Sequence, residues 1–158
     1  MEKLSLPAFP HTLQQRQGKA YILDRTRGKY VRLTPEEWVR QHLLYYLIHQ
    51  LGYPKGLLRL ELPLRYARLA KRVDIACFAV GQSNPLMLVE CKAASQPLRQ
   101  PALDQLALYN AVAKAPYLLL SNGKQHLCFA TAVASSPVLL AGIPTFAQLQ
   151  AAVASCHH

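Results

Sequence analysis

Long hydrophobic runs are missing from this sequence, and so is the pattern of a secretory leader. No stretch approaches the roughly 20 consecutive apolar residues that a membrane-spanning helix needs. The first 19 residues carry charges and contain no continuous apolar core, unlike a signal peptide. We therefore expect a cytoplasmic protein that has no membrane partner.

Closely spaced cysteines are also missing. The four cysteines stand far apart, and there is no CxxC or HxxxH spacing that would predict a zinc site. Cys77, Cys91 and Cys128 lie inside apolar runs. Two disulfides, or a zinc site that includes His126, remain alternatives. The pattern favours free thiols that are buried as small hydrophobic side chains.

Acidic residues are few. Lysine and arginine outnumber aspartate and glutamate by 18 to 8, which gives a formal net charge of +10. The excess lies mostly in residues 1–72, which hold 14 basic and five acidic residues. This surplus favours a polyanionic partner such as nucleic acid. A basic, soluble protein without such a partner can have the same composition, so the net charge supports a nucleic-acid partner only in combination with a candidate functional site.

The order of the expected elements predicts one domain. The chain has 158 residues, 51% of them hydrophobic, as in a single globular core. Thr34, Pro35 and Glu37 form the capping box of a helix that ends at Gly52. The other expected elements are a hairpin at 20–33, strands at 57–65, 72–80 and 86–93, a helix at 99–115, a hairpin that turns at Asn122-Gly123 and a short C-terminal helix. This order predicts an α/β or α+β fold, in which helices flank a central mixed sheet and a β-hairpin precedes it.

Three charged residues interrupt two apolar strands. Asp74 lies in VDIACFAV, and Glu90 and Lys92 lie in LMLVECKA. Because side chains alternate along a strand, Glu90 and Lys92 project from one face. A short turn joins the two segments, so we expect antiparallel neighbours with Asp74 and Glu90 at the same edge of the sheet. If the two carboxylates share one ion, their nearest oxygens should lie about 4–5 Å apart.

Two carboxylates and an ammonium group in an apolar setting need compensation. A divalent cation would provide it, because carboxylate oxygens are ligands that Mg²⁺ accepts. The alternative is a plain ion pair of Lys92 with Glu90 or Asp74 on a solvated face. For an isolated ExK string that alternative would be favoured. The apolar flanks and the additional aspartate favour a functional site here.

The segment that holds these residues, VDIACFAVGQSNPLMLVECKA, resembles the D…ExK signature of the PD-(D/E)xK nuclease superfamily, with Val73 at the proline position. More narrowly, the chain is similar to the N-terminal nuclease domain of type I restriction enzyme R subunits, especially its stand-alone versions. Five segments carry this resemblance in order: LTPEEWVRQHLLYYLIHQLGYP, KRVDI, LMLVECKA, DQLALYNAV and LLLSNGKQH. The resemblance covers about residues 20–130 and implies a restriction-endonuclease-like domain there. The composition of residues 1–19 suggests a loose N-terminal arm, and we expect residues 131–158 to form a C-terminal extension that packs on the same domain.

The resemblance also implies roles for the central residues. Asp74, Glu90 and the backbone carbonyl of Cys91 would bind Mg²⁺ or Mn²⁺. Lys92 would orient or deprotonate the attacking water and offset charge in the transition state. These roles are chemically sound, because the metal acts as a Lewis acid and lysine adds positive charge where negative charge grows.

Further residues have a functional and a structural interpretation. Glu37 fits the helix acid that completes the catalytic site in relatives, with Glu36 as its substitute, but the capping box explains Glu37 nearly as well. Gln105 and Tyr109 resemble a QxxxY element, in which Gln105 would join the catalytic residues and Tyr109 would bind nucleic acid. An ordinary helix face explains this pair equally well.

The predicted function is metal-dependent hydrolysis of phosphodiester bonds in DNA by a PD-(D/E)xK-type nuclease domain of the restriction–modification type. Arg25, Arg27, Lys29 and Arg32 of the basic hairpin are expected near the mouth of the site, where they would bind phosphates. The alternative is a non-cleaving nucleic-acid-binding or interaction subunit of a restriction or repair assembly. Three choices stay open: whether the nucleic acid is DNA or RNA, whether cleavage is endonucleolytic or exonucleolytic, and whether the protein forms a homodimer or joins a larger complex.

Overall fold

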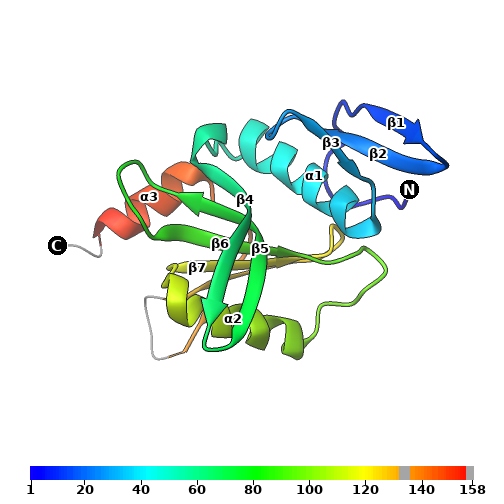
Figure 1. Ribbon diagram of the computed structural model, residues 1–158. Helices are drawn as coiled ribbons and strands as arrows, with labels where there is room; N and C mark the ends of the chain where they lie inside the picture. The colour runs from blue at the N-terminus through cyan, green and yellow to red at the C-terminus, as the bar shows by residue number, and fades with distance from the viewer. Residues whose placement is uncertain (132–135, 156–158) are drawn as a thin grey trace.

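The computed structural model describes residues 1–131 and 136–155, which form two sheets and three α-helices (Figure 1). The small sheet is antiparallel, with the order β1-β2-β3. The large sheet has the order β4-β5-β6-β7-β8-β9 and is mixed, because β6 and β7 run parallel while the other neighbours run antiparallel. The strands are β1 (Leu13–Arg16), β2 (Lys19–Asp24), β3 (Lys29–Arg32), β4 (Leu58–Tyr66), β5 (Leu69–Phe78), β6 (Pro85–Cys91), β7 (Tyr117–Ser121), β8 (His126–Ala130) and β9 (Val138–Leu139).

The helices cover both faces of the large sheet (Figure 1). Leu43 of α1 and Leu149 of α3 belong to one hydrophobic core, and Leu106 of α2 belongs to another on the opposite face. The predicted mixed α/β fold with flanking helices is therefore confirmed. The helices are α1 (Pro35–His49), α2 (Gln100–Ala113) and α3 (Phe146–Ser155), and a 3₁₀ turn, η1 (Lys55–Leu57), precedes β4.

Helix α1 begins as expected, but its capping box is only half formed. Thr34 Oγ1 accepts a 3.0 Å hydrogen bond from the backbone N–H of Glu37, which satisfies a free donor at the helix start. In a full capping box the Glu37 carboxylate would return to the backbone of Thr34. Both of its oxygens instead accept hydrogen bonds from Arg40. The expected reciprocal bond is therefore wrong, and the Glu37 side chain has another role.

The N-terminal segment is not the loose arm that its composition suggested. Leu4 and Leu6 are buried, and the backbone N–H of Ser5 donates a 2.8 Å hydrogen bond to the carbonyl of Gly123. Strand β1 also adds a third strand to the expected hairpin of β2 and β3. The sequence does not predict this strand, because Leu13–Arg16, LQQR, is exposed throughout and lacks an alternating pattern.

The remaining strands lie near their predicted positions, and the hairpin at Asn122-Gly123 is confirmed between β7 and β8. The side-chain oxygen of Asn122 accepts backbone hydrogen bonds from Lys124 and Gln125, which closes the turn. Cys77, Cys91 and Cys128 are buried free thiols, as expected, and Cys156 lies outside the described residues. Across the described part of the chain, no helix combines the length and the apolar character needed to cross a membrane.

Midway along strands β4 and β5, the face of the sheet to which alternate side chains point is reversed. Leu60 pairs with Ile75 and packs toward α1, whereas Leu62 pairs with Val73 and packs toward α2. Residues two apart on a regular strand share a face, so the alternation breaks between these two pairs. The break falls at Glu61, whose φ is +54°, a left-handed conformation that non-glycine residues rarely adopt. The residue across from Glu61 in this register is Asp74.

Candidate active site

Asp74 and Glu90 lie on neighbouring antiparallel strands, β5 and β6. The last pair of this ladder joins Ile75 to Val89, so the next residues, Asp74 and Glu90, stand across from each other. The backbone N–H of Cys91 donates a 2.7 Å hydrogen bond to Asp74 Oδ2, which ties this carboxylate to the strand that carries Glu90. The structure thus brings together the two acids that the sequence paired.

Two ammonium groups approach Glu90 at the same carboxylate oxygen. Lys71 Nζ lies 3.1 Å from Glu90 Oε1, and Lys92 Nζ lies 3.7 Å from it. Lys71 also donates a 3.3 Å hydrogen bond to Gln105 Oε1 and lies 5.8 Å from the centre of the Tyr109 ring. Gln105 and Tyr109 of α2 therefore reach the acidic pair through Lys71.

Sequence reasoning missed Lys71, because regular alternation places it on the opposite face of β5 from Asp74. The break in alternation described above brings it to Glu90 instead. Val73, which shares the parity of Lys71, packs in the α2 core. The string KRVDI shows a lysine close to Asp74 in sequence, but the contact of that lysine with Glu90 follows only from the irregular backbone.

Arg40 connects α1 to the acidic pair. Its Nε and Nη2 atoms lie 2.6 Å and 2.5 Å from the two carboxylate oxygens of Glu37, a two-pronged and charge-assisted contact. Its Nη1 atom lies 3.7 Å from Asp74 Oδ1 and 3.7 Å from Glu61 Oε1. Glu37 therefore lies near Asp74 as expected of a helix acid, but Arg40 engages both of its oxygens. Glu36 is exposed and lines the cleft beside it.

Arg27 belongs to the same ion-pair network. Its Nε atom lies 2.6 Å from Asp24 Oδ2, and its Nη1 atom lies 2.9 Å from Glu61 Oε2. Its Nη2 atom lies 3.6 Å from Glu37 Oε1. Arg27 was expected to bind phosphates, but these three carboxylates already surround its guanidinium group. Its position is therefore that of an internal counter-ion.

The other basic residues of the hairpin divide between two hollows. Lys29 and Arg32 are exposed and line a cleft of about 350 Å³ together with Asp74, as expected. Arg25 is exposed as well, but it lines a separate hollow over α1. The expectation that it sits at the mouth of the acidic site is wrong. Tyr109 is only 4% exposed, which leaves little of its ring for a nucleic-acid contact.

The Asp74 carboxyl group has a strongly shifted affinity for protons. Burial, followed by the nearby charge of Glu90, raises the pKa of Asp74 to about 7. The Cys91 N–H and the charges of Arg40 and Lys71 act in the opposite direction. Two carboxylates that repel each other in a partly buried position are typical of catalytic and metal-binding sites.

A family model described as the type I restriction enzyme R protein N terminus matches residues 35–144, more than half of the chain. The chain belongs to this family. The matched range of this family member contains Glu37, Asp74, Glu90, Lys92 and Gln105. The resemblance inferred from the motifs is therefore confirmed.

Two further comparisons concern curated proteins and solved structures. No curated protein matches this chain. Among solved structures, the chain is similar to a candidate nuclease of DUF820 from Anabaena variabilis ATCC 29413, with 14% sequence identity and a TM-score of 0.42. That similarity covers 85% of this chain and 87% of the other.

The family member's acidic pair fits a divalent cation. Glu90 Oε1 receives both ammonium groups, while Glu90 Oε2 is buried and has no hydrogen-bond partner among the residues that the structure describes. A buried carboxylate oxygen without a partner is costly unless something else binds it. No group of three or more His, Cys, Asp or Glu side chains that could hold a metal occurs within residues 1–131 and 136–155. Mg²⁺ tolerates such a sparse set, because one or two carboxylates with water and phosphate oxygens complete its shell.

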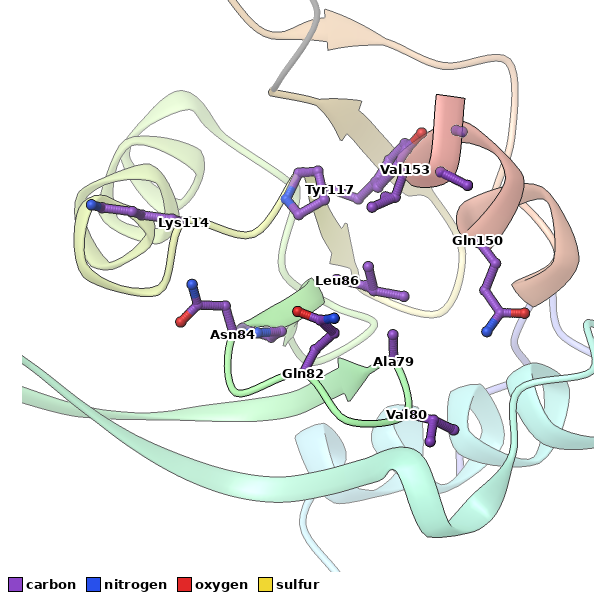
Figure 2. Close-up of a pocket in the computed structure, with 13 residues that line it drawn as sticks. Ala79, Val80, Gln82, Asn84, Leu86, Lys114, Tyr117, Gln150 and Val153 are labelled. Carbon is purple, nitrogen blue, oxygen red and sulfur yellow. The ribbon is translucent and has the colours of Figure 1, made fainter. Parts of the chain in front are cut away.

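A third hollow lies away from these residues. It has a volume of about 610 Å³ and opens between the β5–β6 connection, the start of β7 and α3, where Leu86, Tyr117 and Val153 border it (Figure 2). None of the candidate catalytic residues lines it. The hollow that Asp74, Glu37 and Arg40 share is the cleft beside the hairpin.

Proposed function

We propose that this chain is a metal-dependent nuclease domain that hydrolyses phosphodiester bonds in DNA. The observation that carries the proposal is the placement of Asp74 across from Glu90, with a buried and unpartnered oxygen on Glu90 and Lys92 beside it. Asp74 and Glu90 would hold Mg²⁺ or Mn²⁺, with the Cys91 carbonyl as a further ligand. A bound ion would act as a Lewis acid and lower the pKa of a water molecule.

The protein's own residues hold and orient the reacting groups. Lys71 and Lys92 both contact Glu90 Oε1, so they fix one side of this carboxylate and leave Oε2 for the metal. The Lys92 side chain is 26% exposed, so its ammonium group can also reach a substrate phosphate. There it offsets negative charge as the phosphate is attacked. The Cys91 N–H keeps Asp74 Oδ2 in place during this step.

The basic surface supports DNA as the substrate. Lys29 and Arg32 line the cleft that contains Asp74, so phosphates on either side of the scissile bond can contact them. The net charge of +10 favours association with a polyanion over a distance.

A second candidate function is a binding subunit that does not cut, as a homodimer or within a larger restriction or repair complex. One observation favours it: Arg40 and Arg27 already pair with Glu37, Glu61 and Asp74. If these ion pairs persist when DNA and metal are present, Asp74 is not free to bind a cation. Cleavage separates the two functions.

The test compares wild-type protein with Asp74→Asn and Lys92→Ala on linear and circular DNA, with Mg²⁺, with Mn²⁺ and with a chelator. Asp104→Asn is the matched control, because Asp104 is an exposed aspartate of α2 outside the cleft. We expect wild type and Asp104→Asn to cut with metal only, and the two site variants to bind DNA without cutting.

Two results would contradict the proposal. Wild type that binds DNA but never cuts it with any metal would support the binding subunit. Site variants that cut as well as wild type would show that the activity does not come from Asp74 and Lys92.

A further inference from the structure

A hollow of about 660 Å³ lies over α1, on the other side of the β2–β3 turn from the cleft. We call it the α1 hollow. Its volume falls in the range of about 300–1,000 Å³ that is usual for ligand sites. Its floor includes Leu23 and Leu44, and its border is polar and aromatic. The border residues used below are Phe9, Arg25, Tyr45, His49 and Lys55.

The α1 hollow combines positive charge with aromatic rings. Arg25 and Lys55 are exposed at its border, and none of the described residues that line it is acidic. The Tyr45 ring lies 4.2 Å from the His49 ring and 5.6 Å from the Phe9 ring, centre to centre. Aromatic rings beside basic side chains are the combination that binds unpaired bases and their phosphates. The contrast with the cleft, which holds four acids, is sharp.

The β2–β3 turn connects this hollow to the cleft. Arg25, Thr26 and Gly28 line the α1 hollow, whereas Arg27 and Lys29 line the cleft. One turn thus borders both spaces. In the ribbon, strands β2 and β3 run beside α1 (Figure 1). A strand whose phosphates contact Lys29 in the cleft can therefore continue over this turn toward Arg25.

We propose that the α1 hollow binds unpaired nucleotides of the nucleic-acid strand that lies in the cleft. The inference rests on the proposed function in that nucleic acid is the substrate, but it concerns a separate surface. The hollow suits unpaired bases, because bases in a duplex are stacked on one another and cannot enter a concave site. The charge at its border suits phosphates. The acidic side chains of a peptide carry charge but no flat ring that would stack on Tyr45.

The experiment measures binding in a chelator, so that no cleavage occurs. The ligands are labelled dT and rU decamers and a blunt DNA duplex, and fluorescence anisotropy gives the dissociation constants over a series of salt concentrations. Trp38 is the single tryptophan, and its ring lies 6.2 Å from the Phe9 ring, so its emission reports on the hollow. We expect a decamer to bind more tightly than the duplex and to change the Trp38 emission.

Two variants test the stacking and the charge. Tyr45→Leu keeps an apolar side chain but removes the ring, and it should weaken decamer binding at least about fivefold. Arg25→Ala/Lys55→Ala should reduce the slope of log affinity against log salt by about 1.4, since each lost phosphate contact on a single strand contributes about 0.7. Circular dichroism checks that each variant is folded.

The matched controls remove a tyrosine ring and two positive charges elsewhere. Tyr66→Leu replaces an exposed tyrosine at the end of β4, and Lys19→Ala/Lys114→Asn removes two charges outside the hollow. Asparagine is chosen at Lys114 because its φ is +55°. We expect both controls to bind the decamer like wild type.

Three outcomes overturn the inference: Tyr45→Leu that binds like wild type, a charge control that lowers the salt slope as much as Arg25→Ala/Lys55→Ala, or a duplex that binds as tightly as the decamers. Specific loss in the hollow variants with either decamer supports it, and the preferred decamer identifies the sugar. Because no metal is present, these results stand whether or not the protein cuts DNA. A chain that cuts but fails these tests loses only the α1 hollow.

Discussion

Lys71 Nζ lies closer to Glu90 Oε1 than Lys92 Nζ does, at 3.1 Å against 3.7 Å. The lysine outside the ExK string is therefore the nearer cation of the acidic pair. Gln105 and the Tyr109 ring hold it from α2. Lys71 thus links the second helix to the carboxylate that the proposed metal needs.

Removing this lysine should slow cleavage. Residues that orient metal ligands typically change metal affinity or activity by 10–100-fold when they are lost, so Lys71→Ala should lower kcat at least about tenfold. DNA affinity in a chelator should stay within about twofold of wild type. Lys124→Ala, which removes an exposed lysine that pairs with Glu2, is the matched control. A wild-type rate for Lys71→Ala at saturating metal would show that Glu90 does not depend on it.

The pKa of Asp74 predicts how stability depends on pH without metal. Because burial raises the pKa from 3.8 to about 7, the folded protein binds this proton more tightly than the unfolded chain does. The contribution of Asp74 to stability is thus fully present at low pH and is lost as pH rises from about 4 to 7. Asp74→Asn removes the titrating group, so its stability relative to wild type should increase between pH 5 and pH 8 by an amount on the order of 1 kcal/mol.

Denaturant unfolding of both proteins at the two pH values, in a chelator, measures this difference. Adding Mn²⁺ at pH 8 should then stabilise wild type and leave Asp74→Asn nearly unchanged, because ligand binding to the folded state alone raises its stability. The same stability difference at pH 5 and pH 8 would show that Asp74 titrates normally.

Arg40 should be essential for folding only while its acidic partners are present. Arg40 and Glu37 are both buried, and removing one partner of a buried ion pair costs about 3–5 kcal/mol because the other charge is left unpaired. Arg40→Met should therefore be strongly destabilised in urea unfolding. The double variant Arg40→Met/Glu37→Leu should recover most of that loss. A double variant as unstable as the sum of both single variants would mean that the two residues do not interact.

Two glycines with similar backbones should respond differently to alanine. Gly123 and Gly28 have φ values of +81° and +69°, so alanine strains the backbone at either position by about 1–2 kcal/mol. A Cβ atom at Gly123 would also lie 2.8 Å from Leu4 Cδ2 and 3.2 Å from Val39 Cγ2, whereas Gly28 has open space. Gly123→Ala should therefore lower the free energy of unfolding clearly more than Gly28→Ala. Equal losses would show that Leu4 moves aside without cost.

The sequence predicted the parts of the site that depend on regular geometry. Alternation along β6 and a short connection from β5 were enough to place Asp74 near Glu90 and Lys92. The Asn122-Gly123 turn and the Thr34 cap likewise follow from local chemistry. These features need only neighbours in sequence or in one hairpin.

The parts of the site that the sequence did not predict depend on irregular backbone and on contacts between residues that are distant in sequence. The left-handed Glu61 breaks the alternation that would have placed Lys71 on the other face. Arg27 and Arg40 counted as surplus positive charge, because sequence alone does not show that they face Glu37 and Glu61 across the fold. Pairing among distant charges decides which basic residues stay available to phosphates.

The contact between Ser5 and Gly123 has a consequence for synthesis on the ribosome. Leu4 and Leu6 leave the exit tunnel long before the β7–β8 hairpin that receives them is made. The segment that holds them therefore cannot make this contact until more than a hundred further residues have emerged. Chains released early by a stop codon before Gly123 would lack the hairpin that helps to bury these leucines, and exposed apolar side chains are what chaperones and proteases recognise.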